Sequence, residues 1–277
     1  MKKLSLLYWG LLCCLVSKAQ VSTIAKGEHY PLTIGVVDHV QSAQLGEDRA
    51  LNIYLPGGYD KDTATRYPVI YLLDGSKDED FMHIAGLVQF LTMIDAMPNS
   101  IVVGIANVDR KRDFTYPSAN PADLKLVPTS GGSEKFTAFI EKELQPYIQE
   151  NYKVSGSKTI IGQSLGGLLA TEILLRKPAL FTNYIIVSPS LWWDNETLLK
   201  KAPALLRSNA YRGIKTYLTY GSEGSQMIGD AQKLAGMLKA DLNLRSASNF
   251  MPNEDHLTIL HNAVYSALQW INKPSIK

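Results

Sequence analysis

Short apolar runs rich in β-branched and aromatic residues alternate along this chain with segments of helical periodicity, and this alternation limits the fold more than any other feature. Residues 67–73 and 101–105 are continuous apolar runs, which are typical of strands buried on both faces. Residues 81–96, between them, carry apolar side chains at helical spacing. Strands that alternate with helices form a mostly parallel sheet with helices on both faces. We therefore predict an α/β fold with a central sheet of about eight strands.

The same alternation continues to the C-terminus, and no second domain boundary is predicted. Residues 107–132 are expected to form a long loop, because they combine the charged run 109–112 with several prolines and a double glycine. Ser133 is expected to begin a helix that Pro146 kinks or divides. The other expected strands are 32–40, 50–55, 159–161, 184–187, 216–220 and 246–250, and the other expected helices are 165–176, 196–207, 228–240 and 257–271.

The N-terminal segment has the pattern of a secretory signal peptide. Two lysines precede an almost wholly apolar run over residues 4–16, and small residues then occupy the positions that signal peptidase reads, ending at Ala19. The apolar run is shorter than the ~20 residues that span a bilayer, which argues against a membrane anchor. Neither cysteine follows the small residue that a lipoprotein signal usually has, which argues against a lipid anchor. We predict a cleaved signal peptide over residues 1–19, one folded domain over residues 20–277, and export to the periplasm or the cell exterior.

Removal of this segment changes the composition of the chain. Both cysteines leave with it, so the remaining domain has no disulfide and no cysteine-based metal site. Three lysines and no acid also leave, which turns the formal charge from +2 to −1 and gives no reason to expect nucleic acid or a membrane as partner. The sequence has no histidine pair at metal-ligand spacing and no phosphate-binding loop, so we expect no metal and no cofactor. The oligomeric state is left open.

One motif indicates a specific chemistry. Residues 162–166 read Gly-Gln-Ser-Leu-Gly and stand between an expected strand and an expected helix. A G-x-S-x-G motif in that context is typical of a nucleophile elbow, in which the serine hydroxyl is exposed above the end of a sheet. Ser164 is therefore the candidate nucleophile, and an ordinary glycine-rich turn is the alternative.

A serine nucleophile needs a base, and the elbow arrangement places nucleophile, acid and histidine in that chain order. His256 stands in a polar loop just before the last expected helix, whereas His261 lies inside that helix. His256 is therefore the candidate general base. Glu223 follows the penultimate expected strand and is the candidate acid that orients the imidazole. Asp230 is the competitor, although it is also placed to cap the next helix, and a Ser-His dyad without a strong acid remains open.

An oxyanion intermediate needs preorganised hydrogen-bond donors. The backbone N–H of Leu165, which follows the candidate nucleophile, is the first candidate donor. The second is the N–H of Ser76 or Lys77, in the loop that follows the expected strand 67–73.

Further side chains are candidates for substrate binding. Trp192 and Trp193 follow the strand next to the nucleophile strand, where an aromatic wall can contact an acyl or catechol ring, and core packing is the alternative. Arg112, together with Arg110 and Lys111 in the charged run 109–112, can attract an anionic substrate, with a solvated surface loop as the alternative.

A series of segments, taken in order, resembles a known family. These segments are 45–49 (Leu-Gly-Glu-Asp-Arg) with 53–56, then 67–75, 131–132, 162–168, 188–193 (Ser-Pro-Ser-Leu-Trp-Trp) and 255–256. Together they resemble the putative esterase family of α/β hydrolases, which includes siderophore esterases, S-formylglutathione hydrolase and mycolyltransferases. The run at 188–193 makes the chain most similar to the siderophore-esterase-like branch.

The resemblance implies an α/β-hydrolase catalytic domain, and the short stretch after residue 193 leaves no room for a large lid domain. It also implies a serine carboxylic-ester hydrolase that acts through an acyl-enzyme on a small-molecule or carbohydrate-linked ester, such as a siderophore ester or an acyl group on a carbohydrate. An acyltransferase of the same fold is the alternative, and a non-catalytic binding protein is disfavoured because both Ser164 and His256 are present. The chain departs from many relatives in placing Glu223 two residues, rather than three, after Gly221.

Overall fold

The computed structural model describes residues 27–59 and 64–273. The predicted signal peptide, residues 1–19, lies outside the described residues, so its cleavage and the export of the domain stay predictions. The chain from Thr33 onward forms one compact unit.

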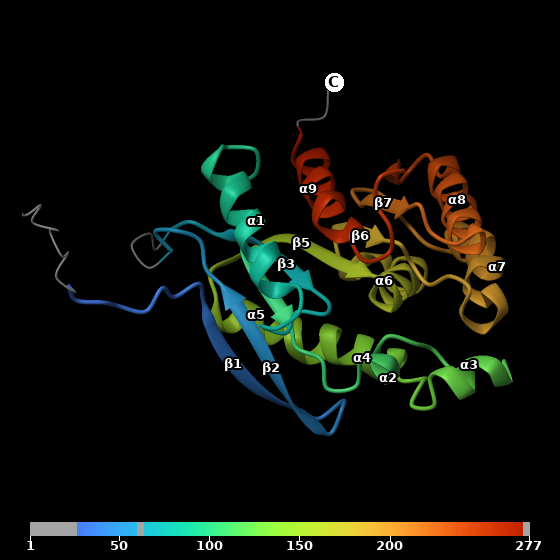
Figure 1. Cartoon of the computed structure of the whole chain (residues 1–277), viewed down its shortest axis with the longest axis horizontal. Helices are drawn as coiled ribbons and strands as arrows, with labels where there is room; N and C mark the ends of the chain where they lie inside the picture. The colour runs from blue at the N-terminus through green and yellow to red at the C-terminus, as the bar shows by residue number, and fades with distance from the viewer. Residues whose placement is uncertain (1–26, 60–63, 274–277) are drawn as a thin grey trace, which may run out of the picture. The chain divides into compact units, whose positions relative to one another are not determined.

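An eight-stranded sheet in the order β1-β2-β4-β3-β5-β6-β7-β8 forms the centre of this unit (Figure 1). The strands are β1 (Val36–Ser42), β2 (Glu47–Tyr54), β3 (Tyr67–Leu72), β4 (Ile101–Ile105), β5 (Val154–Gln163), β6 (Asn183–Val187), β7 (Lys215–Gly221) and β8 (Arg245–Met251). β2 pairs antiparallel with both β1 and β4, and the remaining neighbours pair parallel. The predicted mostly parallel sheet is therefore confirmed.

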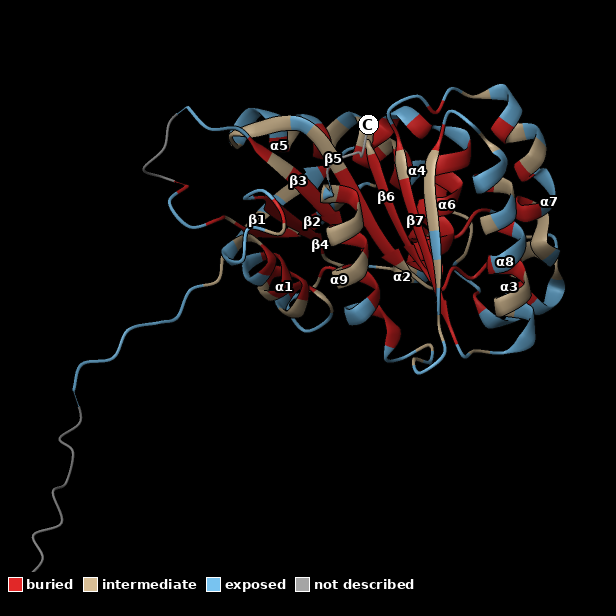
Figure 2. Cartoon of the chain, turned by 90° about the horizontal axis from the view of Figure 1, so that it is seen from above, coloured by how far each residue is buried: buried red, intermediate tan, exposed pale blue. Residues whose placement is uncertain are grey.

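Helices cover both faces of the sheet (Figures 1 and 2). They are α1 (Phe81–Met93), α2 (Arg110–Asp113), α3 (Pro121–Leu126), α4 (Ser133–Phe139), α5 (Gln145–Asn151), α6 (Leu165–Arg176), α7 (Trp193–Ser208), α8 (Ser225–Ala240) and α9 (Ile259–Asn272). Side chains alternate along β3: Ile70 and Leu72 pack in a cluster with α1 and α9, whereas Val69 and Tyr71 pack in a cluster with α4 to α8. The continuous apolar run of this strand is thus explained by burial on both faces.

Two segments differ in detail from expectation. The stretch 107–132 is not one open loop, because Asp109 and Asn120 cap the short helices α2 and α3 by accepting hydrogen bonds from Arg112 N and Ala122 N, both at 3.0 Å. The helix that begins at Ser133 passes through a π-helical turn, Ile140–Leu144, which ends two residues before Pro146. This agrees with the predicted disturbance, since proline removes one backbone donor.

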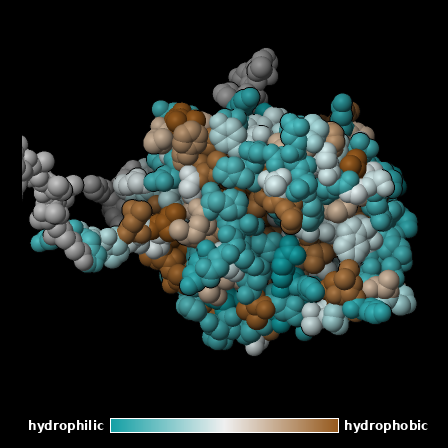
Figure 3. Space-filling view, viewed as in Figure 1, coloured by the Kyte–Doolittle hydropathy of each residue, from teal (hydrophilic) through white to brown (hydrophobic). Residues whose placement is uncertain are grey.

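The surface of the unit is polar over most of the face shown in Figure 3. Hydrophobic side chains gather at the end of α1, where Phe90, Met93 and Ile94 are exposed. Within the described ranges, no helix is both long enough and apolar enough to cross a membrane.

Candidate active site

Ser164 occupies a sharp turn between β5 and α6. Its backbone lies at φ 58° and ψ −118°, a conformation that residues with a Cβ rarely adopt. The turn forces close approaches, because a Cβ atom on Gly162 would overlap the carbonyl oxygen of Gly166. The absence of a side chain at Gly162 therefore allows the sharp turn that carries the strained serine, as expected for a nucleophile elbow.

The hydroxyl of Ser164 meets the imidazole that precedes α9. His256 Nε2 lies 3.0 Å from Ser164 Oγ, and His256 Nδ1 lies 3.3 Å from Glu223 Oε2. The three side chains come from the carboxyl ends of three parallel strands, since Ser164 follows β5, Glu223 follows β7 and His256 follows β8. The structure thus brings the three predicted residues into one hydrogen-bonded series, and their catalytic roles stay predictions.

Glu223 is held as an ionised carboxylate. Its side chain is 3% exposed, and burial works to raise its pKa. Hydrogen bonds from His256 and from the Ser188 hydroxyl outweigh that effect and hold the pKa of Glu223 below its ordinary value. Asp230, the competing candidate, is buried on α8 and accepts a hydrogen bond from Lys233 Nζ at 2.9 Å. The carboxylate that contacts the imidazole is therefore that of Glu223.

Two serines that the sequence analysis did not single out belong to the same constellation. Ser190 Oγ lies 3.2 Å from Ser164 Oγ, and the Ser190 N–H donates to the Ser164 carbonyl at 3.0 Å. Ser188 donates to Glu223 and has a φ of 43°. Their position just after the strand beside the nucleophile strand is the sequence signal that could have identified them.

The candidate oxyanion donors lie in two turns. The N–H of Leu165 belongs to the first turn of α6, where backbone donors have no partner within the helix. The N–H of Ser76 donates to the side chain of Glu79 at 3.3 Å, and the Ser76 hydroxyl accepts from the backbone N–H of Asn107 at 3.2 Å. Ser76 is thus held in a tight turn after β3, and the oxyanion role of these groups stays a prediction.

A salt bridge beside this turn links it to the nucleophile elbow. The Arg110 guanidinium donates to both oxygens of the buried Asp74 carboxylate, at 2.6 and 2.9 Å, and one of its nitrogens lies 3.4 Å from the Gln163 carbonyl. Burial raises the pKa of Asp74 above its ordinary value in spite of Arg110. The sequence offered Arg110 as a group that can attract an anionic substrate and did not identify Asp74 as its partner.

The predicted substrate-binding residues have different environments. Trp193 is fully buried and donates its indole N–H to the Tyr116 carbonyl at 2.8 Å, so the expectation that it lines the site is wrong and it packs in the core. Trp192 is half-buried. The Arg112 guanidinium binds the carboxylates of Glu47 and Asp113, and the structure does not place it with the Ser164 series.

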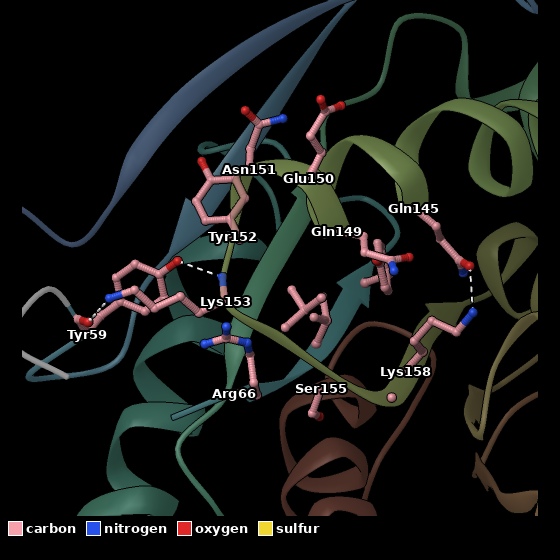
Figure 4. Close-up of a pocket in the computed structure, with 14 residues that line it drawn as sticks. Tyr59, Arg66, Gln145, Gln149, Glu150, Asn151, Tyr152, Lys153, Ser155 and Lys158 are labelled. Atoms are coloured by element: carbon pink, nitrogen blue, oxygen red, sulfur yellow. Dashed lines mark hydrogen bonds between the residues drawn. The ribbon is translucent and has the colours of Figure 1, made fainter. Parts of the chain in front are cut away.

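A large hollow of about 850 Å³ lies away from these residues (Figure 4). It is lined by the amino-terminal parts of β3 and β5, at the end of the sheet opposite Ser164. Lys158 Nζ donates to Gln145 Oε1 at 2.8 Å there, and Lys153 Nζ donates to the Tyr59 carbonyl at 2.7 Å. This hollow is therefore large but does not contain the Ser164 series. Within residues 27–59 and 64–273, no cluster of three or more His, Cys, Asp or Glu side chains is arranged to hold a metal ion.

Comparison with known proteins gives the family. Residues 42–258 match the family model described as Putative esterase. The chain belongs to the putative esterase family. Ferri-bacillibactin esterase BesA of Bacillus subtilis (strain 168) is 31% identical over 252 residues, which cover 82% of the chain and 86% of the relative.

Solved structures of similar proteins share the fold. An IroE-like serine hydrolase from Shewanella oneidensis has a TM-score of 0.79 and 29% identity, covering 86% of the chain and 80% of that protein. The BES protein from Bacillus cereus has a TM-score of 0.78 and 28% identity, covering 91% of the chain and 100% of that protein. The chain is therefore an esterase of the siderophore-esterase-like branch with an α/β-hydrolase fold, and the predicted family and fold are confirmed.

Proposed function

We propose that the chain is a serine esterase that hydrolyses carboxylic esters through an acyl-enzyme. The observation that carries this proposal is the 3.0 Å separation between His256 Nε2 and Ser164 Oγ, with the serine on a strained turn at the end of the sheet. A hydroxyl becomes nucleophilic when a base accepts its proton, and this distance permits that transfer.

The proposed reaction has two halves. In the first, Ser164 Oγ attacks the ester carbonyl carbon while its proton passes to His256 Nε2, and Glu223 stabilises the imidazolium through Nδ1–H. The Leu165 N–H and a donor in the Ser76 turn stabilise the oxyanion. Collapse of the intermediate breaks the bond to the alcohol, which leaves with the proton from His256. In the second half, water gives a proton to His256 while its oxygen attacks the acyl carbon. Collapse of this second intermediate breaks the bond to Ser164 Oγ, which takes the proton back from His256, and the acid leaves.

Two classes of substrate fit this proposal. The relative BesA is named as a ferri-bacillibactin esterase, which supports a siderophore ester. An acyl group on a carbohydrate is the second class. We also propose that the enzyme acts in the periplasm or outside the cell, because residues 1–19 have the pattern of a signal peptide.

The test measures hydrolysis of p-nitrophenyl acetate by residues 20–277, called the mature chain below, and by its Ser164→Ala and His256→Ala variants. We expect hydrolysis by the unchanged chain, loss of at least about 10³-fold in kcat for both variants, and an acetyl group on Ser164 detected by mass spectrometry after rapid acid quenching. An added alcohol acceptor should not divert most of the acyl group, which separates hydrolysis from acyl transfer. Full activity in Ser164→Ala would refute the proposal.

A further inference from the structure

A cavity of about 370 Å³ lies next to the segments that carry the Ser164 series. Trp192, which lines it, comes two residues after Ser190, and Ser190 Oγ lies 3.2 Å from Ser164 Oγ. Gln226, which also lines it, comes three residues after Glu223. The cavity is therefore built on two of the chain segments that form the candidate active site.

An unusual backbone turn forms one wall of the cavity. Asp194, Asn195 and Glu196 have φ values of 51°, 51° and 61°, so three consecutive residues with a Cβ adopt the left-handed conformation. A strained backbone of this kind is kept only where surrounding contacts hold it in place, and it is most common at active sites and ligand-binding sites.

Contacts with the segment before and within α3 hold this turn. The Asp194 carboxylate accepts hydrogen bonds from Ser118 Oγ at 3.1 Å and from Ala119 N at 2.8 Å, and the Asp194 N–H donates to Asp123 at 2.7 Å. Asn120 Nδ2 also donates to Asn195 Oδ1 at 3.1 Å. The effect of the turn is to place Asn195 and Glu196 beside Trp192 in the cavity wall.

The lining of the cavity does not suit an anion. Glu196 and Asp123 contribute two carboxylates and Lys200 contributes one ammonium group, while Lys233 Nζ lies 3.7 Å from the Glu196 carboxylate. The lining therefore has no excess of positive charge, and its other polar groups are neutral amides. The nearby arginines of the charged run add no free positive charge, because Arg110 binds Asp74 and Arg112 binds Glu47 and Asp113. A ferric tricatecholate, which carries three negative charges, would find no excess of positive charge to bind it here.

Hydroxyl groups suit the same lining well. Carboxylate oxygens accept from hydroxyls, side-chain amides both donate and accept, and the indole of Trp192 offers a flat apolar surface. We propose that this cavity binds the neutral, polyhydroxylated alcohol part of the substrate, so that the ester is one carried by a sugar. This inference rests on the proposed serine esterase function and selects one of its two substrate classes.

The experiment compares kcat/KM for an acetylated xylo-oligosaccharide with that for p-nitrophenyl acetate. The chains compared are the mature enzyme, Trp192→Ala, Gln226→Ala and Gln149→Ala. Gln226 is an exposed glutamine on α8, and Gln149 is an exposed glutamine on α5, at the opposite end of the sheet, which makes it a matched control. If Trp192→Ala does not fold, Gln226→Ala still tests the role of the cavity.

We expect Trp192→Ala and Gln226→Ala to raise KM for the sugar ester roughly tenfold more than for p-nitrophenyl acetate, and Gln149→Ala to change neither. The mature enzyme should also prefer the sugar ester to a ferric tricatecholate trilactone. Equal effects of the cavity variants on both esters, or preference for the ferric ligand, would overturn the inference. Failure of the mature chain to cleave p-nitrophenyl acetate would instead count against the serine esterase function itself.

Discussion

The side-chain amide of Gln163 donates a hydrogen bond to the backbone carbonyl of His256 over 2.5 Å. The residue that precedes the candidate nucleophile therefore holds the loop that carries the candidate base. The same loop is fixed from the β7 side, where Ser222 N donates to the Glu254 carbonyl at 2.7 Å and a Cβ on Gly221 would overlap that carbonyl. Two neighbouring strand ends thus help to set the position of the imidazole.

Substitution of Gln163 by Leu keeps the volume of the side chain and removes the donor. A single hydrogen bond contributes about 0.5–1.5 kcal/mol, so the imidazole should spend less time at 3.0 Å from Ser164 and kcat should fall roughly 3–10-fold with little change in KM. Steady-state kinetics on p-nitrophenyl acetate, with Gln149→Leu as a control on an exposed glutamine, measure this. An unchanged kcat would show that the loop holds His256 without Gln163.

The strained backbone of Ser164 predicts an effect on stability. At φ 58°, glycine avoids a strain of the order of 1–3 kcal/mol that any residue with a Cβ carries. Because Ser164→Gly and Ser164→Ala both lack the hydroxyl, their difference isolates the backbone. We expect the glycine variant to have a free energy of unfolding about 1 kcal/mol higher than the alanine variant, measured by urea denaturation. A more stable alanine variant would contradict strain at this turn.

Glu223 makes both activity and stability depend on pH. Its pKa in the folded chain is below the ordinary value of 4.5, so its contribution to stability is complete above that value and is lost as the pH falls through the lower, folded pKa. We expect Glu223→Gln to lose less stability than the unchanged chain in that acid range. Its kcat should fall about 10²–10⁴-fold at neutral pH, because the imidazolium loses its partner.

Asp230→Asn is the comparison for this prediction, since Asp230 was the other candidate acid and contacts Lys233 instead. Urea unfolding from pH 3.5 to 7 and kinetics at neutral pH are measured for both variants. A loss of kcat in Asp230→Asn with activity kept in Glu223→Gln would reverse the assignment of the acid.

The elbow and the imidazole could be predicted because each depends on local signals. The motif around Ser164 needs only a strand, a turn and a helix in succession, and His256 is identified by its loop before the last helix. The core strands were predictable for a similar reason, since β3 and β4 are buried on both faces and read as continuous apolar runs.

The remaining parts of the site depend on contacts between distant segments. The strand expected over residues 159–161 begins earlier, at Val154, and its added residues are mostly polar. They pair with β3 across a shift in strand register between Tyr67 and Val69, which the sequence does not indicate. Ser190 is recognised as part of the candidate site only because β6 pairs with β5, which places Ser190 Oγ 3.2 Å from Ser164 Oγ. The left-handed turn at Asp194 likewise requires partners about 75 residues earlier in the chain.

Arg112 illustrates how the partners of a charged run become visible only in the folded chain. Its guanidinium lies 2.6–3.0 Å from the oxygens of Glu47 and 2.7 Å from Asp113, and Arg49, fully buried, binds the same two carboxylates. The hydrogen bond from Arg112 holds the pKa of Glu47 below its ordinary value. These contacts connect the β1–β2 hairpin to α2, so we expect Arg112 to act on stability.

Arg112→Gln should therefore lower the free energy of unfolding by about 1 kcal/mol at neutral pH, since the pair is partly exposed and Arg49 remains to neutralise Asp113. The loss should shrink as the pH falls through the lowered pKa of Glu47, because protonation removes the same attraction. Lys111→Gln, on the neighbouring exposed residue, is the control and should leave stability unchanged.

The free energy of unfolding is measured by urea denaturation, and KM is measured for an anionic and a neutral ester with the same variants. A rise in KM confined to the anionic ester, with stability unchanged, would instead support the prediction that Arg112 binds substrate.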